Sequence, residues 1–190
     1  MLKRYPKVRS YATNNYMNKI SQVKEPEPWL CGTLTEVPVV ARGTLHALQL
    51  ANEDLHRWAG ELSDGELNQR PFELASVAFH LRHIAGSLDR LLTYAEGHQL
   101  SSEQIAFLKS ELETHSRRES LFEHLASALE QSAQRIRVLA NSDLTEKREV
   151  GSKKLPTTLG GLLVHIADHT QRHVGQAVTT AKIVLAGRKK

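Results

Sequence analysis

The sequence predicts an all-α protein, and three features of its composition support this fold class. Aromatic residues make up only 5% of the chain. Ala, Leu, Glu and Gln are plentiful, and no proline occurs between Pro71 and Pro156. These residue preferences favour helices over sheets. With 190 residues, the chain is long enough for one domain with a sizeable core. Its sustained apolar segments are amphipathic, and none reaches the length of a membrane span.

The first two predicted helices follow from apolar residues at helical spacing. The first begins after Pro38 and ends near Leu62, and the second covers residues 71–96. Pro71 suits an early helical position, and Gly97 suits the stop after the last turn. The apolar stripes recur every three or four residues, at Leu45, Leu48, Ala51 and Leu55, and at Leu74, Val77, Leu81, Ile84 and Leu88.

Two further long helices complete a predicted four-helix bundle. The third covers residues 118–141, and the fourth starts near Thr157, a possible N-cap, and ends by Gly187. Residues 98–116 form a connection too long for a tight hairpin, and a short helix is expected within it. Residues 143–156 are charged and predict an irregular connection with a turn at its glycine. A long connection in the middle of four helices indicates a crossover between helices two and three.

The distribution of charge separates the N-terminus from the rest of the chain. The net charge of +4 arises in the first sixteen residues, which contain four basic residues and no acid. From Met17 onward, 21 basic residues balance 21 acidic ones. Nucleic-acid binding would require a basic stripe on the domain itself, so we expect no nucleic-acid partner. Residues 1–34 predict a poorly structured basic tail and linker, and residues 35–190 a single domain. A transit peptide, or an upstream start with Met17 as the alternative, would explain the acid-free segment.

Cysteine usage indicates the cellular compartment. Cys31 is the single cysteine, so the chain cannot form an intramolecular disulfide. This usage suits a reducing compartment. We therefore expect a cytoplasmic protein with no membrane partner.

Three histidines recur every four residues in the fourth predicted helix: His165, His169 and His173. Residues four apart lie on the same face of a helix. At about 100° per residue, His169 and His173 point toward the buried face defined by Leu162 and Ile166, and His165 lies at its flank. Two inward imidazoles on successive turns need polar partners. The pair therefore indicates a shared metal ion, with a hydrogen-bonded core pair as the alternative.

A third ligand is expected from another helix. A catalytic mononuclear site commonly takes three protein ligands and leaves one position open, whereas a structural zinc site is closed by four. The second helix offers His80 and His83, and helical periodicity places His80 nearer the buried face. His80 or His165 would complete a closed site. The zincin pattern is excluded because Thr170 stands where that pattern requires glutamate.

Two segments of the sequence resemble one known family. Residues 79–91, FHLRHIAGSLDRL, and residues 165–176, HIADHTQRHVGQ, resemble the DinB-like superfamily of metal-binding four-helix-bundle proteins. The family pattern has a helix-two histidine before small residues and Ser, then H-x-x-x-H running into Gly-Gln. Matched residue by residue, the resemblance implies the metal ligands His83, His169 and His173. It spans about residues 35–186.

The resemblance also implies a topology and a chemistry. It implies an up-down-down-up bundle, a divalent metal ion such as zinc or nickel, and a homodimer. Some members of the family resemble thiol-dependent S-transferases, and others resemble metal-dependent hydrolases. The leading hypothesis is a metal-dependent enzyme whose three-histidine site activates water or a low-molecular-weight thiol. Gln176 would contact the small-molecule substrate, and Asp168 would orient an imidazole.

Two other classes of function remain open at this stage. One is a non-catalytic, stress-related helical module that binds a metal or another ligand. The other is a purely structural partner protein whose histidines are incidental. No general base is predicted. Arg82, Arg90 and Arg172 are candidates for contact with a charged thiol cofactor because they lie near the histidines in the sequence.

Overall fold

The computed structural model describes residues 26–112 and 116–188. Most of the predicted N-terminal tail, residues 1–25, therefore lies outside the described residues. The described part begins with a short 3-10 helix, η1 (Pro28–Leu30), which packs against the first long helix. The chain that follows is mostly helical, as the composition predicts.

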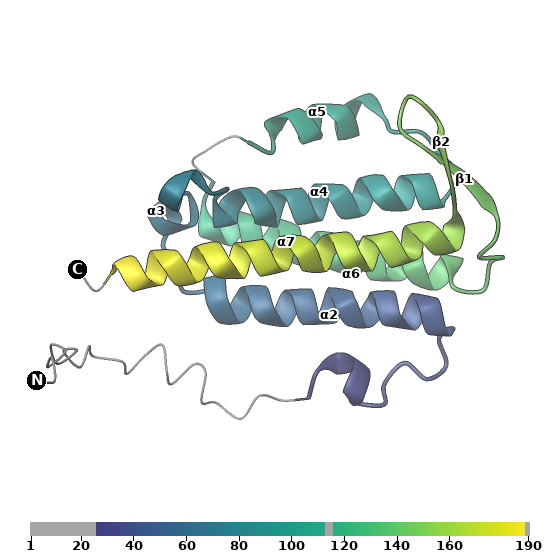
Figure 1. The fold of residues 1–190 in the computed structure, drawn as a ribbon, viewed down its shortest axis with the longest axis horizontal. Coiled ribbons are helices and arrows are strands. Elements are labelled where there is room, and N and C mark those ends of the chain that lie inside the picture. Colours follow the sequence, from purple (N-terminus) through teal and green to yellow (C-terminus); the bar gives the residue numbers. More distant parts are fainter. Residues whose placement is uncertain (1–25, 113–115, 189–190) are drawn as a thin grey trace, which may run out of the picture.

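Four long helices form the body of the molecule, and three short helices connect them. Helix α7 packs against α2 and α4, and α6 packs against the same two helices. Helices α2 and α7 run toward one end of the molecule, and α4 and α6 run toward the other (Figure 1). The long helices are α2 (Val39–Ala59), α4 (Val77–Ala95), α6 (Arg118–Leu139) and α7 (Leu159–Gly187), and the short ones are α3 (Asp64–Leu67), η2 (Pro71–Glu73) and α5 (Ser102–Ser110).

The apolar stripes of the four long helices meet in one core. Burial of these side chains is the main favourable term for the fold. Polar contacts add to the packing of α2 on α7: Gln171 Nε2 donates to the carbonyl of Ala47 at 2.7 Å. Within the described residues, no helix has the length and apolarity needed to cross a membrane. The largest fully buried side chains include Leu55, Leu81, Ile84, Leu88, Leu125, Ile136, Leu163 and Ile166.

Helix α4 begins six residues later than the sequence analysis predicted. Pro71 starts only a single 3-10 turn, because Phe72 and Glu73 adopt left-handed backbone conformations with φ of 52° and 63°. Non-glycine residues in this region interrupt a right-handed helix. The helix restarts at Val77, where the Oγ of Ser76 accepts a hydrogen bond from the Phe79 amide at 3.1 Å.

Removing this cap is expected to weaken the helix that carries His83. Ser76→Ala leaves the Phe79 amide without its partner and should lower the free energy of unfolding by about 1 kcal/mol. Urea denaturation monitored by circular dichroism measures the change. Ser152→Ala, in an exposed turn, is the control and should stay within about 0.5 kcal/mol of the parent. Equal losses in both variants would contradict a capping role.

The connection before α7 is a β-hairpin, which corrects the expectation of irregular structure there. Strands β1 (Lys147–Val150) and β2 (Leu155–Thr158) pair antiparallel, with Gly151 at a φ of 73° in the turn. Arg148 Nε donates to the carbonyl of Ala95 at 2.6 Å, which ties the hairpin to the end of α4. The Oγ1 of Thr158, one residue after the predicted cap, accepts from the Gly161 amide and starts α7.

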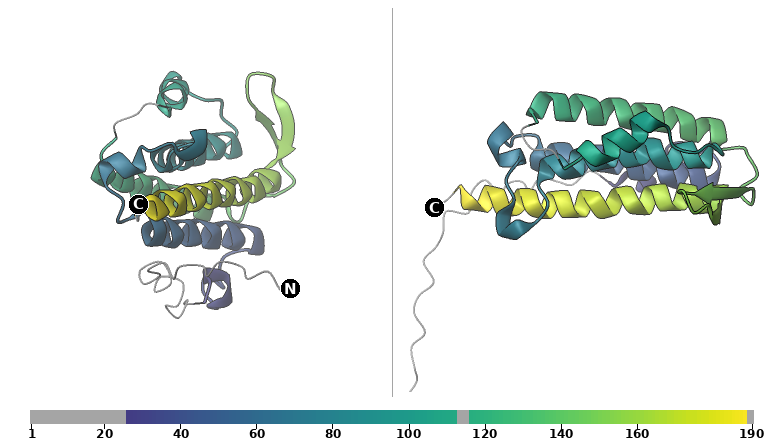
Figure 2. Two further views of the ribbon diagram at one scale, coloured as in Figure 1. Left: turned by 60° about the vertical axis from the view of Figure 1, so that its left-hand side comes forward. Right: turned by 90° about the horizontal axis from the view of Figure 1, so that it is seen from above.

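Helix α5 lies outside the four long helices, along α4 (Figures 1 and 2). A capping box between Ser101 and Gln104 fixes its start. None of its residues, Ser102–Ser110, is buried, and the side chains of Ile105 and Leu108 are each 43% exposed. The short helix that the sequence predicts in this connection is therefore present, but it adds little to the core.

Candidate metal centre

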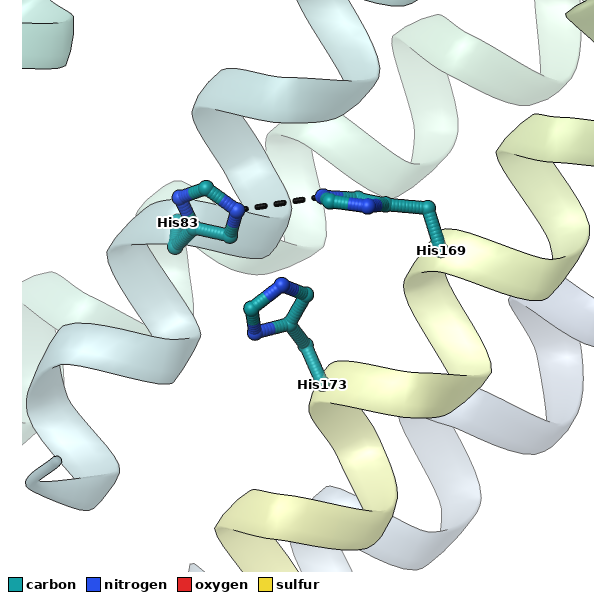
Figure 3. A group of neighbouring side chains, drawn as sticks. All are labelled: His83, His169 and His173. Carbon is teal, nitrogen blue, oxygen red and sulfur yellow. Dashed lines mark hydrogen bonds between the residues drawn. The ribbon is translucent and has the colours of Figure 1, made fainter. Parts of the chain in front are cut away.

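Three imidazoles meet where α4 faces α7. His83 comes from α4, and His169 and His173 lie one turn apart on α7 (Figure 3). Each ring offers one nitrogen, and these three nitrogens lie within 4.8 Å of one another. His83 Nε2 and His169 Nε2 are 3.1 Å apart. The ring of His173 completes the group, with its centroid 4.2 Å from that of His83 and 4.6 Å from that of His169.

This donor set fits a single divalent metal ion. A tetrahedral zinc ion with Zn–N bonds of about 2.0–2.1 Å separates its nitrogen ligands by about 3.3–3.4 Å. The spacing between His83 and His169 is close to that value. Two facing imidazole nitrogens must otherwise share a proton, because two lone pairs repel each other. Neutral imidazole is a common ligand for zinc, copper, iron and nickel.

A buried carboxylate determines which nitrogen of His83 faces the other two rings. Glu111 Oε2 lies 2.7 Å from His83 Nδ1, and the side chain of Glu111 is only 2% exposed. The second oxygen, Oε1, accepts from Arg90 Nη1 at 2.6 Å. A carboxylate at Nδ1 requires a proton on that nitrogen, which leaves the Nε2 lone pair directed at His169. Metal-binding histidines are typically oriented in this way.

The sequence analysis did not identify Glu111. This residue lies in the connection between α5 and α6, and 28 positions separate it from His83. No spacing rule links the two positions, because a loop of this length can place its residues almost anywhere. Asp168, which the sequence suggested as the residue that orients an imidazole, is exposed and pairs with Arg172 on the outside of α7.

His80 is buried beside the group but is not part of it. Only 3% of this residue is exposed, and its Nδ1 lies 3.1 Å from the Nδ1 of His173. One of these two nitrogens must carry a proton. This contact engages the Nδ1 of His173, while the other ring nitrogen of His173 points toward the gap between His83 and His169 (Figure 3). His80 therefore supports the ring of His173, as Glu111 supports that of His83.

The described residues bring three histidines into this group, and His165 is not one of them. His165 is exposed, and its ring centroid lies 5.4 Å from that of His169. The helical wheel likewise separates His165 from its two neighbours. The periodicity that ranked His80 above His83 identified the more buried residue, but the less buried His83 joins the group.

Loss of hydration keeps the imidazoles of His80, His169 and His173 neutral. Loss of hydration lowers the pKa of His169 to about 4 and that of His173 to about 3, and the neighbouring His83 adds to both shifts. Burial and His83 likewise lower the pKa of His80 to about 4. Near pH 7 the lone pairs of these rings are therefore free of protons and available to a metal ion.

A cavity of about 410 Å³ lies next to His80. Arg172 and Gln176 line it on the α7 side, and Leu74 and Ala75 line it where the chain enters α4. Gln176, which the sequence analysis placed near a substrate, therefore lies at this cavity. The cavity offers a small molecule both apolar and polar contacts, and His80 is the residue that links its lining to the three converging histidines.

The fold and the site define a class of protein: a helical domain with a three-histidine centre suited to a divalent metal ion. The family model of the DinB superfamily matches residues 47–177, which is more than half of the chain. The chain therefore belongs to the DinB superfamily. The matched range contains the three histidines and Glu111, and this superfamily is metal-binding. Comparisons with curated proteins and with solved structures gave no match.

Proposed function

We propose that this protein is a metal-dependent enzyme in which His83, His169 and His173 hold one ion that activates water or a low-molecular-weight thiol. The reaction would be a hydrolysis or the transfer of a sulfur-linked group to or from a small-molecule substrate. One observation carries the proposal: in the described part of the chain, three imidazoles converge. Three protein ligands leave a coordination position for a reactant.

The side chains of this protein would bind the ion, orient the imidazole rings and receive the substrate. His83, His169 and His173 would hold a divalent ion, and we propose zinc or nickel, which are among the metals that neutral imidazoles bind. Such an ion would supply Lewis-acid chemistry, which makes water or a thiol a nucleophile near neutral pH. Glu111 and His80 would keep the rings of His83 and His173 in place. The cavity beside His80 would receive the substrate, with Arg172 and Gln176 as polar contacts.

The proposed function also includes a helix topology, an oligomeric state and a cellular compartment. We propose that the four long helices form an up-down-down-up bundle. Their packing and their directions in Figure 1 support this topology. We also propose a cytoplasmic homodimer that binds neither nucleic acid nor membranes. The balanced charge from Met17 onward and the single cysteine support this setting.

The coordination number distinguishes the enzyme from the non-catalytic module. X-ray absorption of the zinc-loaded or nickel-loaded protein should reveal three imidazoles and at least one ligand from outside the protein. His80→Gln should leave that count at three, because His80 contacts His173 rather than the ion. Four imidazoles in the parent, falling to three in this variant, would favour a closed structural site and the stress-related binding module.

Activity is the second part of the test. The loaded protein should turn over in screens of thiol-transfer and hydrolysis reactions, and His173→Ala should abolish the turnover. Activity that persists in His173→Ala, or that does not depend on added metal, would argue against the proposed chemistry.

A further inference from the structure

Glu111 connects the outer helix α5 to the candidate metal centre. It directly follows α5, outside the four long helices, yet only 2% of the residue is exposed. Both carboxylate oxygens are engaged on α4, one with His83 Nδ1 at 2.7 Å and the other with Arg90 Nη1 at 2.6 Å. Its carbonyl oxygen accepts a further hydrogen bond from Arg82 Nε at 3.1 Å. One residue thus makes three contacts with α4.

The surface of α4 is shaped to receive this carboxylate. A Cβ atom at Gly86 would lie 2.6 Å from Glu111 Oε1 and 2.7 Å from Arg90 Nη1. Both distances are shorter than real contacts of a Cβ atom allow, so any larger residue at position 86 would displace the ion pair. The missing side chain is what lets the carboxylate reach the back of His83.

The rest of α5 attaches to α4 through one half-buried ring and exposed or half-buried polar contacts. A Cβ atom at Gly86 would lie 2.7 Å from Cε1 of Phe107, so this ring packs against α4. None of the residues in Ser102–Ser110 is buried. Gln104 Nε2 donates to Asp89 Oδ2 at 2.6 Å and to Thr93 Oγ1 at 2.8 Å, and the first of these contacts is exposed. Exposed polar contacts contribute little net free energy. The contacts of Glu111 are therefore the buried polar attachment of α5 to α4.

We propose that a divalent ion at the three histidines tightens the docking of α5 through Glu111, which acts as the positioning residue of His83. The proposal rests on the metal site of the proposed function. A cation on the Nε2 of His83 draws electron density from the ring, so Nδ1–H becomes a stronger donor to the carboxylate. Coupling between two binding events is reciprocal. A docked α5 therefore increases the affinity of the site for metal.

The test uses the full chain with zinc as the probe. Zinc affinity is measured by competition with a chelator, and hydrogen exchange of residues 102–111 is measured with and without zinc. Glu111→Gln keeps the size of the side chain but removes its charge. It should weaken zinc binding by about 10–100-fold. Glu103→Gln, an exposed position on the same helix, should bind zinc like the parent.

Hydrogen exchange gives a readout that a merely structural role would not produce. Zinc should slow exchange in α5 of the parent and of Glu103→Gln, but not in Glu111→Gln. The measurement on the parent needs no variant, so the proposal can be tested even if Glu111→Gln fails to fold.

The results of these experiments distinguish failure of the coupling between zinc and α5 from failure of the metal site itself. If the parent binds zinc but its α5 exchanges equally fast with and without it, the coupling is wrong and the metal site stands. The same conclusion follows if Glu111→Gln folds and binds zinc as tightly as the parent. If the parent binds no zinc, the coupling and the proposed function both fail.

Discussion

Replacement of His173 by alanine is expected to lower the metal content from about one ion per chain to almost none. The variant keeps two of the three converging imidazoles, and His80 loses the ring that its Nδ1 contacts. Two histidines hold a divalent ion far less tightly than three in a preformed site. Elemental analysis of protein purified without an affinity tag measures the content directly.

His98→Ala is the matched control, because His98 is an exposed histidine outside the group. It should keep the metal content of the parent. A full equivalent of metal in His173→Ala would mean that another histidine, such as His80 or His165, takes over as a ligand. Absence of metal from the parent as well, even after reloading with zinc or nickel, would refute the metal centre.

The metal-free protein is expected to lose stability as the pH falls from about 6.5 toward 4. The pKa of His80 and of His169 is lowered to about 4 and that of His173 to about 3, from an ordinary value of 6.5. Within this window the unfolded chain binds more protons than the folded chain, so acid favours unfolding. Each histidine can contribute at most about 1.4 kcal/mol per pH unit. Because the rings are partly solvated and their charges interact, we expect a total loss of about 2–4 kcal/mol between pH 7 and pH 5.

Urea denaturation in the presence of a chelator tests this expectation, with tryptophan fluorescence as the signal, since Trp58 is buried in the core and Trp29 is exposed. A double variant with His169 and His173 replaced by glutamine should show a flatter dependence on pH. His98→Gln should follow the parent. The ion pair with Arg188 lowers the pKa of Glu66 to about 2, so the stability that this pair contributes is lost only as the pH falls below about 4.5, outside the window of the test. Equal stability at pH 7 and pH 5 in the parent would contradict neutral, buried imidazoles.

Periodicity predicted most of the helical body and two members of the site. His169 and His173 are four residues apart on the inward face of one helix, so the local sequence determines that they are neighbours. The choice between His80 and His83 could not be made in the same way. Burial favours the residue that faces the core, but a metal ligand must reach a neighbouring helix and remain near solvent. The family resemblance, rather than periodicity, selected His83.

The features that the sequence did not predict depend on contacts between distant segments. Glu111 becomes a partner of His83 only after the connection folds back along α4. The hairpin before α7 has short, exposed strands with a proline in the second, and its contact with the end of α4 through Arg148 is tertiary. The late start of α4 depends on left-handed conformations at Phe72 and Glu73, which their residue types do not favour.

The position of α7 has a consequence for the synthesis of the protein. This last helix carries two of the three histidines and packs against both α2 and α4. A ribosome adds about 5–20 residues per second, so α2, α4 and α6 emerge before α7 and leave their apolar faces uncovered for seconds. A nascent chain without α7 has only one of the three imidazoles and cannot capture an ion. The ion of the proposed function could therefore bind only after α7 has been made, and a chain truncated before α7 would expose the apolar faces of α2 and α4 that this helix covers.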